Sequence, residues 1–286
     1  MSAPLPTASR WNTHARSRYP GLWDGCVGAW CPSLGASGAR LADASRFNNW
    51  ATLTNMDPAT DWVVSGGGYS LDFDGTNDQA VASQILAGKI GNLSAMCWAH
   101  LSGTSLRGAM LQIGRAEATT SDGFGFGVGL TTLDNSGNNI IGAYEGIRWI
   151  SSGIAIGTGW HHIAMTINAS SHPTFYLDGK FVYSDAVGTM LAIGSSGAGN
   201  TNLGGYLSNF APGYPRFFQG IVDDWRVYDR ICHPEEIRIL ARRRAIAYEP
   251  AYRPAYYTET DAGGGGGGAA KPVLFHSYYM FQGMRP

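Results

Sequence analysis

The carboxylates and histidines are the side chains of this sequence that could carry out catalysis. Hydrolysis of a glycosidic bond needs two carboxylates roughly 5–9 Å apart across a cleft. The pattern Glu-x-Asp-x-x-Glu, which would place such a pair along one face of a strand, does not occur. The glutamates are Glu117, Glu145, Glu235, Glu236, Glu249 and Glu259. Two of them begin a predicted helix, two lie near the C-terminus, and neither of the others has a carboxylate two or four residues away. The sequence therefore predicts a protein that is not an enzyme.

The adjacent histidines His161 and His162 lie in a predicted strand. Successive side chains of a strand point to opposite faces, so these two cannot bind one metal ion together. We expect one to face the core with a hydrogen bond and the other to be exposed. Neither the Gly-x-Ser-x-Gly nor the His-Glu-x-x-His motif occurs.

Asp223 is the most informative acidic residue. Alternation places it on one strand face with Ile221, Trp225 and Val227, which points its carboxylate into the core. Burying an unpaired carboxylate is too costly to tolerate. We therefore expect backbone amides, an arginine or a cation beside it.

The four cysteines are not spaced as a disulfide framework. Cys26 and Cys31 would lie some 16 Å apart on opposite faces of one strand, at about 3.3 Å per residue. Cys97 is in the middle of a predicted strand and Cys232 precedes a helix. We expect four reduced, mostly buried thiols in a protein assembled in a reducing cytosol.

Composition excludes several classes of partner. The 286 residues include 40 Gly, only 14% are charged, and the net charge is −1. This charge gives no electrostatic reason to bind nucleic acid or an anionic membrane. No apolar run approaches the ~20 residues of a membrane span. The segment Met1–Trp23 lacks the apolar stretch of a signal peptide.

Turn signals recur every eight to fifteen residues, which favours an all-β protein over alternating strands and helices. The predicted strands are Gly25–Cys31, Tyr69–Phe73, Gln79–Ala82, Leu93–Leu101, Met110–Ile113, Gly123–Leu130, Asn139–Tyr144, Ile147–Ile150, Trp160–Ile167, Thr174–Leu177, Lys180–Ser184, Asn202–Leu207 and Phe218–Tyr228. Asp178-Gly179 predicts a tight hairpin turn. Pro234, followed by two glutamates, predicts one helix.

Three regions follow from composition. Residues 1–20 form an extended N-terminal arm, residues 21–248 the folded body, and residues 249–286 a Pro- and Gly-rich linker with an apolar tail. Six glycines, Gly263–Gly268, act as flexible chain before the tail segment Val273–Phe281. We expect the tail to pack either on a neighbouring subunit or on its own domain, through Phe275, Tyr278, Tyr279 and Phe281.

A second set of aromatic residues lies in or beside predicted long loops. These residues are candidates for contact with a carbohydrate or a partner, with packing or subunit contact as the alternative. They are Trp149, Tyr206, Phe210, Tyr214 and Phe217.

Several segments, in order, resemble the LamG-like, concanavalin A-like jelly-roll family. The segments are Asp43–Asn55, Gly66–Asp78, Trp160-His-His-Ile-Ala, Tyr176–Lys180 and Gly220–Ile237. The resemblance covers roughly Gly21 to Ala247. It implies an all-β fold, a two-sheet antiparallel jelly-roll sandwich with one short C-terminal helix and extended termini.

The same resemblance implies a structural calcium that joins Asp223 to the loop that begins at Asp43. Asp43, Asn48 and Asn49 would supply oxygen ligands, which suit calcium. Arg46 stands where the family usually has glycine. The alternative is that Asp223 accepts hydrogen bonds from loop amides without a metal, with Arg46 as its counter-charge.

The stretch Thr54–Trp62 and the tail also resemble LamG-like virion proteins of tailed bacteriophages. That implies a virion surface subunit, a capsid decoration or tail protein assembled in the host cytoplasm. It would be a homo-oligomer, for example a trimer, that contacts other virion subunits through both termini. The alternative function is a lectin-like carbohydrate-binding module or adhesin that recognises a cell-surface glycan.

Overall fold

The structure is a computed structural model. It describes residues 17–89, 91–103, 108–115, 122–128, 139–144, 149–185, 200–205, 217–249, 256–257 and 273–274. The limits predicted for the N-terminal arm and the tail fall largely outside these residues and stay predictions. No helix of the described part is long and apolar enough to cross a membrane.

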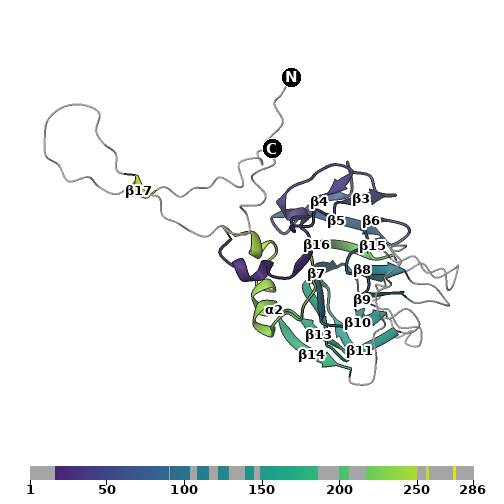
Figure 1. Cartoon of the computed structure of the whole chain (residues 1–286). Coiled ribbons are helices and arrows are strands. Elements are labelled where there is room, and N and C mark those ends of the chain that lie inside the picture. The colour runs from purple at the N-terminus through teal and green to yellow at the C-terminus, as the bar shows by residue number, and fades with distance from the viewer. Residues whose placement is uncertain are drawn as a thin grey trace, which may run out of the picture.

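Two eight-stranded antiparallel sheets form a sandwich (Figure 1). The first, here called the capped sheet, has the order β14 (Lys180–Ser184), β13 (Pro173–Leu177), β12 (Gly159–Ile167), β7 (Leu93–Leu101), β16 (Gln219–Tyr228), β5 (Gly68–Asp74) and β4 (Trp62–Ser65), with β1 (Cys26–Trp30) also paired to β16. The second sheet has the order β11 (Trp149–Ile156), β10 (Asn139–Tyr144), β9 (Asp122–Val128), β8 (Gly108–Arg115), β15 (Asn200–Leu203), β6 (Gln79–Ser83), β3 (Ala51–Thr54) and β2 (Arg40–Leu41). The strands β17 (Tyr256–Tyr257) and β18 (Val273–Leu274) pair as a separate sheet. The predicted two-sheet antiparallel fold is confirmed.

The core lies between the sheets and follows the alternation of the strands. In β5, Leu71 and Phe73 are buried while Asp72 and Asp74 are exposed. Trp225 of β16 is fully buried, and its indole N–H donates to the carbonyl of Met110 in β8 (2.9 Å). This bond joins the sheets where apolar burial alone would leave the indole nitrogen unpaired.

A cap of short helices covers the outer face of the capped sheet. It consists of η2 (Pro20–Trp23), α2 (Pro234–Leu240) and η4 (Ile246–Tyr248). The predicted helix is confirmed: His233 and Glu236 form a capping box before and after Pro234. Ile237 and Leu240 bury its apolar side in the cap. A further turn, η3 (Pro32–Leu34), follows β1.

Most predicted strands are present; the short strands β2, β3 and β4 of the sandwich and the pair β17 and β18 were missed. β2, β3 and β4 have two to four residues each, too few for the alternation of apolar and polar residues to be visible. The strand predicted at Ile147–Ile150 is too short, because β11 continues to Ile156; residues 147 and 148 lie outside the described residues. The predicted strand Asn202–Leu207 is displaced, since β15 begins at Asn200.

All four cysteines are free and buried, as predicted. Burial raises the pKa of Cys26 and of Cys232 to about 12, which keeps both thiols protonated and unreactive at neutral pH. Assembly in a reducing compartment stays a prediction.

A β-bulge in β16 corrects one prediction. Four residues of β16, Asp223 to Arg226, lie opposite three of β7, Trp98 to Met96, and Asp224 has a positive φ of 47°. The extra residue puts Val222 rather than Ile221 into the core with Trp225. Asp223 is therefore buried under the cap rather than between the sheets.

Gly204 gives a test of packing between the sheets. Its φ is +76°, and an added Cβ would lie 2.1 Å from the Phe73 ring. Gly153 has a similar φ of +68° with nothing within 4 Å, so it is the matched control. We expect Gly153→Ala to lower the free energy of unfolding by about 1 kcal/mol. Gly204→Ala should cost about 1–3 kcal/mol more, through overpacking, in urea unfolding. Equal losses would contradict the tight packing of Phe73.

Candidate functional site

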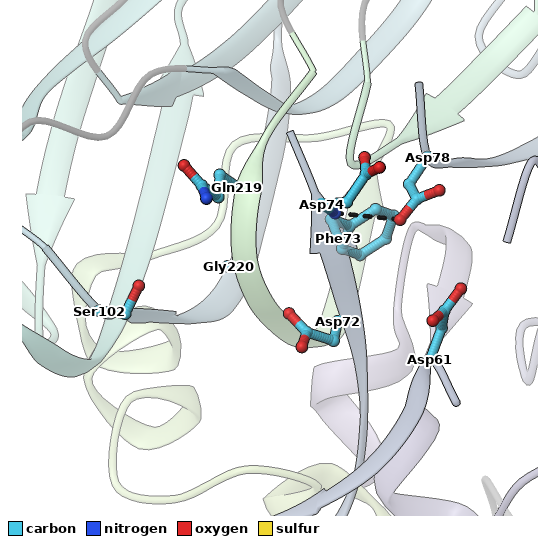
Figure 2. A pocket seen from close by; sticks show the side chains of 8 residues that line it. All are labelled: Asp61, Asp72, Phe73, Asp74, Asp78, Ser102, Gln219 and Gly220. Carbon is cyan, nitrogen blue, oxygen red and sulfur yellow. Dashed lines mark hydrogen bonds between the residues drawn. The ribbon is translucent and has the colours of Figure 1, made fainter. Parts of the chain in front are cut away.

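A polar pocket of about 400 Å³ lies where β5 ends and β16 begins (Figure 2). Its lining residues are Asp61, Asp72, Phe73, Asp74, Asp78, Ser102, Gln219 and Gly220. In Figure 2 the carboxylates of Asp61 and Asp78 lie on one side of β5, and Ser102 and Gln219 lie on the other. Four acidic side chains and no basic one line the pocket, so it attracts cations and hydrogen-bond donors.

The turn from β5 to β6 fixes two of the carboxylates. Asp74 accepts hydrogen bonds from the backbone N–H of Thr76 (2.7 Å) and of Asn77 (3.2 Å). Asp78 accepts one from the N–H of Asp74 (3.0 Å), the bond drawn in Figure 2. Asp61 precedes β4, and its carbonyl accepts from the N–H of Asp72 (2.9 Å). Backbone hydrogen bonds thus fix the carboxylates of Asp74 and Asp78 and hold the main chain of Asp61 beside that of Asp72.

The carboxyl groups of the pocket differ in the direction in which their pKa is shifted. Burial, followed by the charge of Asp61, raises the pKa of Asp72. Burial also raises the pKa of Asp78. Burial alone would raise the pKa of Asp74, but three backbone N–H groups outweigh it and lower that pKa. Asp74 therefore loses its proton more readily than Asp72 and Asp78, and ionised carboxylates accept hydrogen bonds from hydroxyl groups.

The pocket does not follow from the glycosidase pattern considered above, because its acidic residues are all aspartates. The visible signal was the spacing of Asp72 and Asp74, two residues apart and alternating with the buried Leu71 and Phe73. That pattern places both carboxylates on the outer face of one strand. The approach of Asp61 and Asp78 depends on turns, which the pattern does not reveal.

Asp43, a predicted calcium ligand, is buried and already holds four hydrogen bonds. Its carboxylate accepts from the N–H of Ala29 (2.8 Å), the N–H and hydroxyl of Ser45 (2.8 and 2.6 Å) and the N–H of Asn49 (2.7 Å). The amide of Asn49 donates to the carbonyl of Val27, and the amide oxygen of Asn48 accepts from the Trp50 indole. The loop is thus ordered by its own polar groups.

Asp223 accepts hydrogen bonds from a different set of groups. It accepts from the N–H of Ser33 (3.1 Å) and of Asp224 (2.8 Å), and from the Ser33 hydroxyl. Its counter-charge is Arg244, 3.3 Å away, and not the expected Arg46, which lies over the Phe47 ring.

Asp43 and Asp223 share none of these hydrogen-bonding partners. Within the described ranges, no three His, Cys, Asp or Glu side chains are grouped to hold a metal ion. The structural calcium at Asp43, Asn48, Asn49 and Asp223 stays a prediction.

The structure describes few of the aromatic candidates. Tyr206, Phe210, Tyr214 and the tail residues Phe275, Tyr278, Tyr279 and Phe281 lie outside the described residues. Trp149 is the first residue of β11. Phe217 is only 8% exposed, which fits the packing alternative better than a surface contact.

The histidines have the separate environments that alternation predicts. His162 is 1% exposed, and burial lowers its pKa to about 3, so it is neutral at physiological pH. His161 is partly exposed, and its Nδ1 lies 2.9 Å from the carboxylate of Asp178 in the β13–β14 turn.

Comparison with known proteins gives a family and a set of fold neighbours. Residues 73–238, more than half of the chain, match the model of a laminin G family described as the concanavalin A-like lectin/glucanases superfamily. No curated protein matches the sequence.

Two solved structures illustrate the fold likeness. Domain 4 of AbnA, an extracellular arabinanase from Geobacillus stearothermophilus solved with arabinotriose, has a TM-score of 0.56 and 15% identity. The match covers 76% of this chain and 98% of that domain. The binding domain of botulinum neurotoxin serotype D has a TM-score of 0.53 and 11% identity; the match covers 77% of this chain but only 52% of that one. Identities this low establish the fold alone.

Asp223 gives a test by pH. Burial first, and the charge of Asp224 second, raise its pKa from 3.8 to about 6 in the folded protein. The folded state thus binds this proton more tightly than the unfolded state, so the stabilisation is present at low pH and is lost as pH rises through 6. Relative to Asp223→Asn, the native protein should gain about 1.4 kcal/mol of unfolding free energy at pH 5 compared with pH 8. Denaturant unfolding of both proteins at each pH measures this difference. A difference that is constant, or larger at pH 8, would contradict the raised pKa.

Proposed function

The chain belongs to the concanavalin A-like lectin/glucanase superfamily, and we propose that it is a non-enzymatic structural and binding protein, a bacteriophage virion surface subunit attached through its two terminal segments. The observation that carries this proposal is where the ends of the sandwich lie. The hydroxyl of Ser17 donates to the carbonyl of Ala247 (2.6 Å), and the N–H of Arg18 donates to the carbonyl of Glu249 (2.7 Å).

These bonds bring the first and last residues of the described sandwich side by side. The elements next to them, η2 and η4, also lie together at one side of the capped sheet (Figure 1). The chain therefore enters and leaves the sandwich at one place on its surface. A domain held at one point can present its remaining surface to solvent, which suits a capsid decoration or tail protein.

The tail offers the means of attachment. Four aromatic side chains, Phe275, Tyr278, Tyr279 and Phe281, follow the glycine run Gly263–Gly268. Phe275 follows directly after β18, which pairs with β17, and burial of the four rings on a neighbouring copy would stabilise a homo-oligomer.

Replacing the four tail aromatics by serine should abolish self-association. We expect the full chain to sediment as an oligomer at micromolar concentration and the variant as a monomer with an unchanged thermal unfolding midpoint. The matched control replaces Gly263–Gly268 by serine, which keeps a flexible linker, and should stay oligomeric. A monomeric native chain, or a variant that associates as before, would contradict attachment through the tail.

The acidic pocket favours a second candidate function, carbohydrate binding. Carboxylates accept hydrogen bonds from sugar hydroxyls, while Ser102 and Gln219 can donate as well as accept. The pocket supports this second function, whereas the likeness to the arabinanase domain concerns the fold only. Because the four carboxylates are not balanced by a lining cation, an amine-bearing glycan fits the pocket better than an anionic one.

Binding to this pocket is testable with arabinotriose, cellotriose and the amine-bearing trisaccharide of chitosan. We expect saturable NMR shifts at β5 and at the start of β16, largest for the chitosan trisaccharide. Asp72→Asn should weaken binding about tenfold or more, since a hydrogen bond to an ionised group is lost. Asp24→Asn removes the same charge from an exposed position outside the pocket and should have no effect. Absence of shifts for every sugar would contradict the carbohydrate function, and release of reducing ends would contradict the non-enzymatic one.

A further inference from the structure

The side chain of Arg226 is a charged group buried under the cap. It is 1% exposed, and its Nε donates to the carboxylate of Asp224 (3.1 Å). Its two terminal nitrogens have no hydrogen-bond partner among the described residues. Burial alone would lower the pKa of Arg226, but the charge of Asp224 raises it, so the guanidinium stays charged.

Two aromatic rings lie against the guanidinium of Arg226. The guanidinium carbon lies 4.8 Å from the ring centroid of Trp23 and 4.9 Å from that of Tyr248. The two rings also meet edge to face, with centroids 5.0 Å apart. A desolvated cation is attracted to the faces of such rings, so both rings hold the charge in place.

These two rings come from the N-terminal and the C-terminal end of the domain's sequence. Trp23 is the last residue of η2, and Tyr248 is the last residue of η4. The Trp23 indole donates to the carbonyl of Ala247 (3.2 Å), while the hydroxyl of Tyr228, two residues after Arg226, donates to the carbonyl of Leu22 (2.9 Å). Each end is therefore bound both to β16 and to the other end.

Asp224 extends the contact to the turn before η4. Its second oxygen accepts from the N–H of Ala245 (2.9 Å), which has a left-handed φ of 56°. The β16 bulge places Asp224 and Arg226 under the cap together. One carboxylate thus fixes both the guanidinium and the backbone that carries Tyr248.

If either η2 or η4 moved away, the charged guanidinium of Arg226 would lose part of the environment that stabilises it. If η2 opens, the guanidinium loses the Trp23 face; if η4 opens, it loses the Tyr248 face and one anchor of its carboxylate. The second end is then held less strongly, because a buried cation without its partners is destabilising.

We propose that Arg226 is a latch that makes the two ends of the domain open and close as one cooperative unit. The attachment of one terminal segment is thereby coupled to that of the other. The latch is independent of what the terminal segments bind, so its test does not depend on the virion function.

Hydrogen exchange of the full chain, read by mass spectrometry, tests the latch. Arg226→Met keeps an apolar side chain of similar length, and Asp224→Asn in the same chain avoids a lone buried carboxylate. In this double variant we expect residues 17–24 and 246–249 to exchange about tenfold faster, by a similar factor, while β6 and β15 of the second sheet are unchanged. The control Arg238→Met removes an exposed arginine paired to Glu235 on α2 and should change neither end.

A second variant separates the latch from a general loss of stability. Tyr248→Leu removes the ring contacts of Tyr248 with both Arg226 and Trp23, so it is made in the native chain and in the double variant. The latch requires that it speeds exchange at residues 17–24 more in the native chain than in the double variant. Faster exchange at one end alone, no change in the double variant, or an equal increase in every strand would overturn the proposal.

Discussion

Three buried charges under the cap, with a fourth that is largely buried, set the constraint on which the rest of the structure depends. Asp223 and Asp224 are adjacent in β16, Arg226 follows them, and Arg244 comes from the segment after α2. A single ion in such a place would cost several kcal/mol, so the two acids and the two bases must stay together. The bulge makes this possible, because regular alternation would turn the adjacent acids to opposite faces.

Arg244 also connects these charges to the strands at the edge of the capped sheet. Its guanidinium donates to the carbonyls of Ser65 and Gly66 in the β4–β5 turn and to the hydroxyl of Ser70 (2.8 Å). It also lies 4.1 Å from the ring centroid of Trp160. The residues that neutralise the bulge thus also fix β4 and β5, the strands beside the acidic pocket. One half of β16 holds the chain ends and the other lines the pocket, which allows one domain both to be attached and to bind.

The sequence allowed the fold to be predicted because alternation, the Asp178-Gly179 turn and the family-like segments all indicate a sandwich. It also predicted that Asp223 is buried and requires compensation. It did not predict on which face of β16 Asp223 lies, because the pattern of apolar residues does not reveal a bulge. Nor did it identify Arg244 as the partner: a contact between residues 21 positions apart depends on the path of the chain through α2. The pocket was missed for a similar reason, since Asp61 and Asp78 approach β5 through turns.

The hydrogen bond between Ser17 and Ala247 has a consequence for how such a domain can be joined to other proteins. A domain whose ends are neighbours can be inserted into a surface loop of another protein without stretching the recipient. Closing the short gap between its ends costs little chain entropy. The same geometry would permit its ends to be joined and new ones opened elsewhere, so gene fusion and rearrangement could move this sandwich between proteins as an intact unit.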